Sequence, residues 1–399
     1  MNKILTTDTD NLTGTSGDDI FTATYNDAPT GYTFGISDTL NGGAGTDTLD
    51  IDTNHVDAIT PIDDYWTGVS HIEKVVIHGG VGAQTITTGL AFEAAFAGNG
   101  VDLTTTSDAG AITLTMGSFT GGATIEMTST DGVQTFTSGT GHTTVTATST
   151  AGAQTITGPG LDVVTATSTH GVQTITGENL TKVTAMSDDG DQTITGSHIF
   201  EVNAHTTGAQ TITMGAGENI VTAVSPAANN VIATKGGNDT ISAETATGNY
   251  VIDAGRGNDK VNGGSGSDHL TGGAGNDKIH GGAGNDVING GAGIDKVTGG
   301  DGQDTFVLSS KMGFDRITDF SVADDTINID HSVFTSLSTI SADNFVTGSA
   351  AADANDFLIY NSNNGHLLYD VDGNGAGAAV DIAIVGAHLA LTSADFAAV

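Results

Sequence analysis

The chain has 399 residues, of which 10 are Lys or Arg and 47 are Asp or Glu, so its formal charge at pH 7 is −37. Phosphate backbones repel such a polyanion, which argues against nucleic-acid binding. The absence of Cys excludes disulfides and zinc–thiolate sites. With no run of 18 apolar residues and no apolar segment near the N-terminus, we expect neither membrane insertion nor a Sec signal peptide.

Residues 1–74 contain short Gly-rich segments that lead into aspartates. Gly-Gly-Ala-Gly-Thr-Asp-Thr-Leu occupies residues 42–49, and Asp38 and Asp47 are nine residues apart. Asp19 follows a similar glycine-containing segment. We expect this segment to cap the repeats that follow, and these three aspartates are candidate cation ligands.

Residues 75–253 form a long repeat whose apolar residues recur in two columns with steps of 18 to 20 residues, and both columns continue without a break into residues 254–307. This periodicity argues against the disorder that an acidic, aromatic-poor composition would otherwise favour. One column holds Phe136, Ile156, Ile175, Ile194, Ile212, Ile232, Ile252, Leu270, Ile288 and Phe306. The other holds Ile125, Val145, Val164, Val183, Val202, Val221, Ile241, Val261, Ile279 and Val297. The fold class is therefore all-β, a right-handed parallel β-solenoid with two strands per coil. Residues 90–98 break the period and predict a short helical insertion.

Strand alternation turns a Thr-x-Thr pair outward in each upstream coil. These pairs are Thr113 and Thr115, Thr135 and Thr137, Thr155 and Thr157, Thr174 and Thr176, Thr193 and Thr195, and Thr211 and Thr213. Thr is a good strand former that keeps a surface soluble, which accounts for much of the pattern. The regular array also resembles the ice-binding face of some β-solenoid antifreeze proteins.

Residues 254–307 contain tandem nine-residue repeats with an aspartate every nine positions, at Asp259, Asp268, Asp277, Asp286, Asp295 and Asp304. An apolar residue follows two positions after each. The pattern resembles the repeat-in-toxin (RTX) nonapeptide, a resemblance that implies a β-roll binding several calcium ions. Glycines permit turns with positive φ, and stacked carboxylates about 5 Å apart repel one another unless a cation lies between them. The further candidate metal residues are Asp239, Asn258, Asn276, Asn285, Gly264, Gly266, Gly273, Gly275, Gly282, Gly284, Gly291, Gly293, Gly300 and Gly302.

The ligand position of the RTX coils carries a different residue in the upstream coils. It holds Gln134, Gln154, Gln173, Gln192 and Gln210, followed by Asn230 and Tyr250. Stacked Gln amides can satisfy one another's hydrogen bonds. We therefore predict a metal-independent solenoid over residues 75–253, joined to a metal-dependent roll over residues 254–307.

Residues 308–399 are similar to the region that follows the RTX coils in serralysin-type secreted proteins. That resemblance implies a β-rich cap and a type I secretion signal, ending here in Asp395, Phe396, Ala397, Ala398 and Val399. The layout of the whole chain resembles that of bacterial surface-layer proteins of the Caulobacter RsaA type.

Catalytic motifs are absent from the sequence: neither H-E-x-x-H nor G-x-S-x-G occurs. His142, His170, His198 and His205 fall near predicted turns, and we expect them to be solvated and without carboxylate partners. A carbohydrate-active enzyme on a β-helix is the remaining catalytic alternative, and it would need a charged groove. We expect no enzymatic activity.

The sequence thus predicts a calcium-dependent structural protein of the cell surface or extracellular matrix, exported by type I secretion. Its expected partners are further copies of itself, the secretion machinery and a cell-surface polysaccharide. An ice-binding or adhesive solenoid is the alternative.

Overall fold

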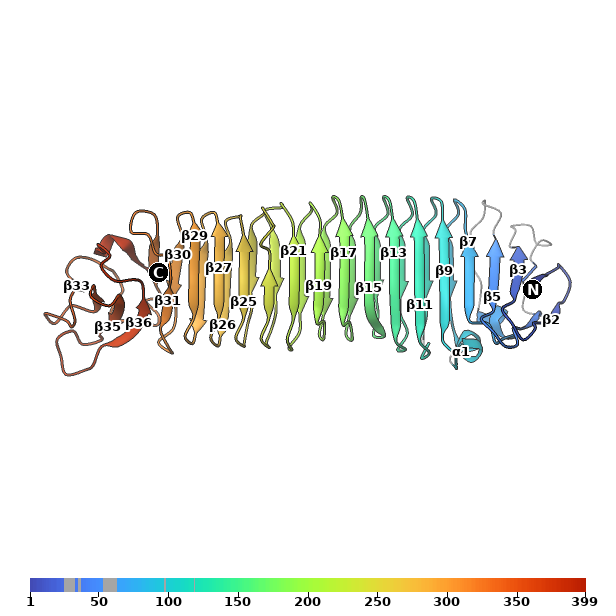
Figure 1. Ribbon diagram of the computed structural model, residues 1–399, viewed down its shortest axis with the longest axis horizontal. Coiled ribbons are helices and arrows are strands. Elements are labelled where there is room, and N and C mark those ends of the chain that lie inside the picture. Colours follow the sequence, from blue (N-terminus) through green and yellow to red (C-terminus); the bar gives the residue numbers. More distant parts are fainter. Residues whose placement is uncertain (25–32, 35–36, 53–62, 97, 118) are drawn as a thin grey trace. The chain divides into compact units, whose positions relative to one another are not determined.

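Short strands separated by tight turns make up most of the chain. A computed structural model describes residues 1–24, 33–34, 37–52, 63–96, 98–117 and 119–399. The chain divides into two units, Met1–Gly208 and Ala209–Val399. In both units, successive coils contribute one strand to a first sheet (sheet 1) and one to a second sheet (sheet 2), as the parallel arrows in Figure 1 show. The predicted boundaries at residues 74, 253 and 307 do not coincide with this division and stay predictions.

The first unit contains two parallel sheets and a small third one. Sheet 1 consists of β1 (Asn2–Ile4), β3 (Ile20–Thr24), β5 (Thr48–Asp52), β7 (Lys74–His78), β9 (Val101–Ser107), β11 (Ala123–Ser129), β13 (Thr143–Ser149), β15 (Leu161–Ser168), β17 (Lys182–Ser187) and β19 (Glu201–His205). Sheet 2 consists of β8 (Gln84–Thr87), β10 (Ile112–Thr115), β12 (Gln134–Thr137), β14 (Gln154–Thr157), β16 (Gln173–Gly177) and β18 (Gln192–Gly196). The third sheet consists of β2 (Asn11–Thr13), β4 (Thr39–Asn41) and β6 (Val69–Ser70).

The second unit contains the coils with the nine-residue repeats and the C-terminal cap. Sheet 1 consists of β21 (Ile220–Val224), β23 (Thr240–Ser242), β25 (Lys260–Gly264), β27 (Lys278–Ala283), β29 (Lys296–Asp301) and β31 (Asp315–Ile317), followed by β36 (Val380–Ile384), β35 (His366–Tyr369), β34 (Leu358–Asn361) and β33 (Phe345–Thr347). Sheet 2 consists of β20 (Gln210–Met214), β22 (Asn230–Ala233), β24 (Tyr250–Asp253), β26 (His269–Ala274), β28 (Val287–Ala292), β30 (Thr305–Leu308), β32 (Thr326–Ile329) and β37 (Phe396–Ala398).

The predicted apolar columns form the core between the two sheets. In the first unit Ile156 pairs with Phe136 and Ile175, and Val164 pairs with Val145. The same register holds in the second unit, where each coil repeats its apolar residue 18 to 20 positions later. Every member of both columns is buried. The parallel β-solenoid predicted from the period is therefore confirmed.

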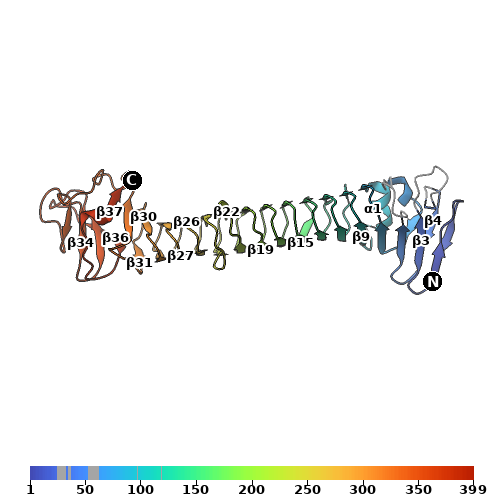
Figure 2. The same ribbon diagram turned by 90° about the horizontal axis from the view of Figure 1, so that it is seen from above.

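The predicted helical insertion is α1 (Leu90–Phe96), which lies beside β9 at the edge of the coils (Figure 2). The Asp63 carboxylate, at the start of the 3-10 helix η1 (Asp63–Trp66), accepts hydrogen bonds from the backbone NH groups of Gly89, Ala91 and Phe92 at 2.7 to 3.0 Å. Phe92 packs edge-on against Trp66 with ring centroids 5.1 Å apart. This aromatic contact packs α1 against η1. Ala97, within the predicted segment, lies outside the described residues.

The C-terminal cap extends both sheets of the second unit. In sheet 1, β36 pairs with β31 in parallel, and β35 pairs with β36 and β34 in antiparallel directions. In sheet 2, β37 pairs in parallel with β32, just after the 3-10 helix η2 (Ser393–Asp395). Of the helices described in the structure, none has the length and apolar character needed to cross a membrane.

Outward threonines form two registered rows on sheet 2 of the first unit. The inner strand positions Gln154 and Ile156 are fully buried, whereas Thr155 and Thr157 are half-buried on the outer face. One row holds Thr85, Thr113, Thr135, Thr155, Thr174 and Thr193, and the other holds Thr87, Thr115, Thr137, Thr157, Thr176 and Thr195. In the second unit Thr211 and Thr213 pair instead with Val231 and Ala233, so the pattern does not continue there.

Candidate metal sites

Two columns of buried aspartates run along the coils of the second unit. One column lies where the strands of sheet 1 begin, and the other lies where the strands of sheet 2 begin. Each aspartate follows a turn, which contains glycine in every case except Asp325, and stands two residues before a core apolar residue. On sheet 1 the column is Asp239, Asp259, Asp277, Asp295 and Asp315, and on sheet 2 it is Asp268, Asp286, Asp304 and Asp325. Their exposed fractions are 8% or less. The six predicted Asp thus lie at equivalent points of their coils, joined by Asp239 and by two that the repeat pattern did not identify, Asp315 and Asp325.

One oxygen of each column carboxylate is satisfied by the neighbouring coil. Asp277 Oδ1 accepts a hydrogen bond from the backbone NH of Asp259 at 2.8 Å, and Asp286 Oδ1 accepts one from that of Asp268 at 2.8 Å. The same bond recurs along both columns at 2.7 to 3.3 Å. Each aspartate therefore ties its own coil to the one before it.

The second carboxylate oxygen has no hydrogen-bond donor among the described residues. This holds for Oδ2 of Asp239, Asp259, Asp268, Asp277, Asp286, Asp295 and Asp304. A buried, ionised oxygen without a partner is costly, so it calls for a compensating cation or proton. Seven such atoms in regular succession indicate a repeated binding site rather than a local defect.

A glycine leaves the space around each unpaired oxygen open. A Cβ added at Gly272 would lie 2.4 Å from Asp277 Oδ2 and 2.7 Å from the carbonyl oxygen of Gly290. A Cβ at Gly281 would likewise lie 2.1 Å from Asp286 Oδ2 and 2.6 Å from the carbonyl oxygen of Gly299. A carboxylate oxygen and a backbone carbonyl oxygen therefore face the same small space. Calcium prefers such hard oxygen ligands, and the residues present fit it.

The repeat pattern did not predict the glycines that face the carboxylates, because the glycines taken from it were the second of each Gly-Gly pair and the glycine two residues later. The facing glycines are Gly263, Gly272, Gly281, Gly290 and Gly299. The predicted glycines lie further round the turn: Gly273 and Gly275, for example, have φ of +109° and +136° and stack on the carbonyl oxygens of Gly255 and Gly257. Their role is to let successive turns approach closely.

The predicted asparagines do not face the carboxylates. Asn258, Asn276 and Asn285 are exposed, and each Oδ1 accepts a hydrogen bond from a backbone NH 18 residues later, at 2.7, 2.8 and 2.9 Å. They form a ladder that holds the turns together. Their side-chain Oδ1 atoms thus already have donors, and the assignment of these three residues to the metal sites stays a prediction.

Burial raises the pKa of the column carboxyl groups. The pKa of Asp259 and of Asp268 rises to about 6, and that of Asp277 and of Asp286 rises to about 7. Loss of hydration is the main cause, and neighbouring carboxylates add to it at Asp277. At the C-terminal end of the sheet 1 column, burial and then the Asp295 charge raise the pKa of Asp315 to about 8. Near neutral pH the columns thus favour an added positive charge.

A metal ion in these sites would need backbone as well as side-chain oxygens as ligands. Within the part of the chain that the structure describes, no group of three His, Asp or Glu side chains converges on one point. Each site offers a carboxylate oxygen and turn carbonyl oxygens instead. Such a mixed oxygen set suits calcium better than the nitrogen and sulfur ligands typical of zinc.

The N-terminal candidates repeat part of this geometry. Asp47 Oδ1 accepts from the backbone NH of Asp19 at 2.7 Å, and Asp38 Oδ1 accepts from that of Asp10 at 2.9 Å. Asp47 Oδ2 has no hydrogen-bond partner among the described residues, and a Cβ at Gly42 would lie 2.4 Å from it. Asp19 differs, because the N-terminal ammonium lies 2.8 Å from its Oδ1 and lowers its pKa to about 2.

In the first unit, the same position of the coil holds the predicted glutamine ladder. Gln154, Gln173 and Gln192 each donate from Nε2 to the Oε1 of the preceding Gln, at 2.8, 2.9 and 2.9 Å. The amides also donate to backbone carbonyls, as Gln173 does to Met186 at 3.0 Å. All four side chains from Gln134 to Gln192 are buried. These coils are satisfied internally, which confirms the ladder.

Asn230 and Tyr250 occupy the corresponding position in the early coils of the second unit. Asn230 Oδ1 accepts from the backbone NH of Gln210 at 3.0 Å, and Asp268 Oδ1 accepts from that of Tyr250 at 2.8 Å. The buried Tyr250 hydroxyl reaches past Asn230 and donates to Gln210 Oε1 at 2.9 Å. Burial raises the pKa of Tyr250, so the hydroxyl keeps its proton. The change from amide to carboxylate therefore takes place within these coils.

Two of the histidines differ from expectation. His142 Nδ1 lies 2.8 Å from Asp162 Oδ2, and His170 Nδ1 lies 2.8 Å from Asp189 Oδ2. Each acidic partner comes from the next coil, 19 or 20 residues later, a spacing that a search for local motifs does not cover. The prediction that these two histidines lack carboxylate partners was wrong.

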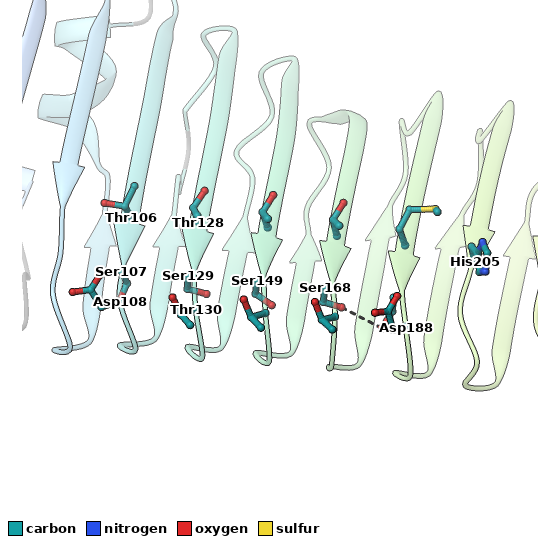
Figure 3. Close-up of a pocket in the computed structure, with 16 residues that line it drawn as sticks. Thr106, Ser107, Asp108, Thr128, Ser129, Thr130, Ser149, Ser168, Asp188 and His205 are labelled. Carbon is teal, nitrogen blue, oxygen red and sulfur yellow. Dashed lines mark hydrogen bonds between the residues drawn. The ribbon is translucent and has the colours of Figure 1, made fainter.

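A hydroxyl-lined groove of about 650 Å³ runs along the ends of the sheet 1 strands in the first unit. Figure 3 shows Thr106 and Thr128 on one side and Ser129, Ser149 and Ser168 on the other. The serine hydroxyls form hydrogen bonds with backbone carbonyls of the turns. Ser129 Oγ donates to the Gly132 carbonyl at 2.9 Å, and Ser149 Oγ donates to the Gly152 carbonyl at 2.8 Å. Both of these bonds close a single turn, whereas Ser168 Oγ donates to Ser187 Oγ of the next coil at 3.2 Å and so links two turns.

Comparison with known families agrees with this geometry. The model of the RTX calcium-binding nonapeptide repeat matches four segments, residues 36–50, 227–245, 247–279 and 280–309. These segments include Asp38, Asp47, Asp239 and the six predicted ligands, whereas Asp19 lies outside them. No curated protein matches the chain. The chain therefore carries RTX calcium-binding nonapeptide repeats within a parallel β-solenoid, and calcium is the ion that such repeats bind; the assignment of individual aspartates as its ligands stays a prediction.

Proposed function

We propose that this chain is a calcium-dependent secreted structural protein that self-assembles into a surface layer or an extracellular matrix. RTX repeats are typical of secreted bacterial proteins, which supports an extracellular site of action. The observation that carries the proposal is a contrast within one chain. The ladder from Gln134 to Gln192 in the first unit is satisfied by its own amides, whereas seven carboxylates in the columns of the second unit each have an oxygen with no hydrogen-bond partner among the described residues.

Calcium availability would then control where the second unit folds. Where calcium is scarce, repulsion between buried carboxylates keeps these coils unfolded, a state suited to export through a narrow channel. Where calcium is abundant, binding to the folded coils alone stabilises them by mass action. The resemblance of residues 308–399 to serralysin-type C-terminal regions supports type I secretion as the route.

Electron microscopy of the purified chain with calcium and with EGTA tests self-assembly. Ordered sheets or filaments in calcium, and their absence in EGTA, are the expected result. The variant Asp277→Asn/Asp286→Asn serves as the control, because it removes two column charges without touching the exposed surface. Dispersed particles in calcium, with the calcium sites filled, would refute assembly while leaving the calcium sites intact.

We further propose that the role of the protein is structural rather than catalytic. The alternative function, an ice-binding or adhesive solenoid, would use the threonine rows of sheet 2. Thr155 and Thr174 are direct neighbours in a flat, registered array, which favours an ice-binding or adhesive surface. Replacing both with Tyr abolishes thermal hysteresis if this alternative holds. Thr165→Tyr, on the other sheet, is the matched control. Absence of thermal hysteresis in the unmodified protein rejects ice binding.

A further inference from the structure

Four of the ten basic residues of the chain form one row on the outer face of sheet 1 in the second unit. Lys260 pairs with Lys278, Lys278 with Lys296, and Lys296 with Arg316. All four side chains are exposed. Because adjacent parallel strands are about 4.8 Å apart, the row places one positive charge per coil over four coils.

Like charges directly opposite one another in a sheet are destabilising, so the row needs an explanation. Elsewhere on sheet 1, a lysine on the outer face has an acidic partner on the adjacent strand. In the first unit Lys182 pairs in register with Glu201, and Lys182 Nζ lies 2.9 Å from Glu201 Oε1. In the row, by contrast, no ion pair or hydrogen bond joins any of the four basic side chains to another described residue.

The geometry of the coil does not require a basic side chain at the position directly after the column aspartate. The residue directly after the column aspartate is basic in four successive coils of sheet 1. On sheet 2 the corresponding outward residues are His269, Val287, Thr305 and Thr326. The same repeat thus accepts neutral residues on one face and carries stacked cations on the other.

A shallow groove of about 170 Å³ follows the basic row. Its second wall is the neighbouring outward row, with Asn262, His280 and Thr298. These groups can donate and accept hydrogen bonds with hydroxyl groups. The groove therefore combines regularly spaced positive charges with uncharged or weakly basic polar groups.

We infer that the basic row binds an extended acidic polysaccharide that carries one carboxylate per sugar. A sugar ring in an extended chain spans about one coil, so successive carboxylates match successive cations. A DNA strand has a phosphate every ~3.4 Å and does not match this spacing. The remaining acidic surface opposes binding only weakly, since charges beyond about 8 Å are screened at physiological ionic strength.

Calcium should strengthen this interaction. The sheet 1 carboxylates of Asp259, Asp277 and Asp295 immediately precede the row residues and point to the opposite side of the strands. Neutralising them with calcium leaves the row as the dominant local charge. The inference rests on the calcium sites and does not depend on self-assembly into a lattice.

The test measures binding of soluble polyglucuronate to the full chain by titration calorimetry in calcium, with neutral dextran as the comparison polymer. The row variant is Lys260→Thr/Lys278→Thr/Lys296→Thr/Arg316→Thr, since Thr occupies the corresponding position in two coils of sheet 2. The matched variant removes the same number of charges outside the row, as Lys3→Thr/Lys74→Thr/Lys182→Thr/Lys235→Thr. Circular dichroism in calcium checks folding, and Lys278→Thr/Lys296→Thr replaces the row variant if that variant does not fold.

We expect the unmodified chain and the matched variant to bind polyglucuronate within twofold of each other, and the row variant to bind at least tenfold more weakly. Binding should weaken with added salt, and dextran should not bind. Equal binding by the row variant would overturn the inference, because calcium bridges or another surface would then account for it. Absence of polyglucuronate binding by the unmodified chain would also overturn the inference. The same holds if the row variant loses self-association but still binds polyglucuronate.

Discussion

Asp277 and Asp259 lie one coil apart, and the backbone NH of Asp259 donates to Asp277 Oδ1 at 2.8 Å while Asp277 Oδ2 has no donor among the described residues. Each carboxylate is therefore half satisfied by the fold. The hydrogen-bonded half fixes the stacking of the coils, and the unpaired half creates the demand for a cation. This division of roles within one side chain leads to the predictions that follow.

Removing a column charge should have opposite effects with and without calcium. In Asp277→Asn, Oδ1 can still accept the hydrogen bond from Asp259, and the new amide can donate to the carbonyl oxygen of Gly290 that faces it. In EGTA the variant should unfold at a higher temperature than the unmodified chain, because a buried, repelled charge is gone. In calcium it should be less stable by about 1–3 kcal/mol, since a ligand is lost. Calorimetry in both buffers checks the sign, and destabilisation in both would contradict the proposed role of the charge.

Filling the space beside one carboxylate should remove one calcium site. Gly272→Ala places a Cβ 2.4 Å from Asp277 Oδ2, in the space that the cation would share. We expect equilibrium dialysis to show fewer bound calcium ions than for the unmodified chain. Gly348→Ala is the control, because its Cβ would meet only the carbonyl oxygen of Ala350 at 3.6 Å. Unchanged calcium binding in Gly272→Ala would place the ions elsewhere.

Without calcium, the second unit should become more stable as the pH falls. The pKa of Asp277 and of Asp286 is raised from 3.8 to about 7 in the folded chain. The folded coils therefore bind more protons than the unfolded chain between roughly pH 4 and pH 7, so this contribution is complete below about pH 4 and is lost as the pH rises through 7. Urea unfolding in EGTA at pH 5 and pH 8 measures the difference. In calcium the trend should reverse at low pH, because protons compete for the same oxygens.

Breaking the glutamine ladder should destabilise the first unit regardless of calcium. Gln173→Ala leaves Gln154 Oε1 without its donor and Gln192 Nε2 without one of its acceptors. Each buried group that loses its partner costs about 1–3 kcal/mol. The outward neighbour Thr174→Ala should change stability by less than about 0.5 kcal/mol. Denaturation in EGTA compares the two, and equal stability of both variants would show that the ladder contributes little.

The sequence was sufficient to predict the contacts that follow from the repeat period. The apolar columns, the glutamine ladder from Gln134 to Gln192 and the equivalence of the column aspartates all follow once 18 to 20 residues are recognised as one coil. The same period could have revealed the pairing of His142 with Asp162, but a search for local motifs overlooks partners one coil apart.

Other features depend on side-chain reach and on backbone direction, which a period does not specify. Tyr250 is long enough to pass Asn230 and meet Gln210, a contact across two coils. Asn276 belongs to the exposed asparagine ladder, whereas Gly272 faces the Asp277 carboxylate, although the two residues are only four positions apart. Only the path of the backbone through that turn decides which residue lines the site.

Hydrogen exchange with and without EGTA, followed in peptides from both blocks, tests the central claim most directly. In calcium, the amides of residues 134–192 and of residues 259–304 should both be protected. In EGTA at pH 8, the second set should exchange as an unfolded segment while the first keeps its protection. Equal loss of protection in both blocks, or full protection of residues 259–304 in EGTA, would contradict the division of the chain into coils satisfied by amides and coils that require an ion.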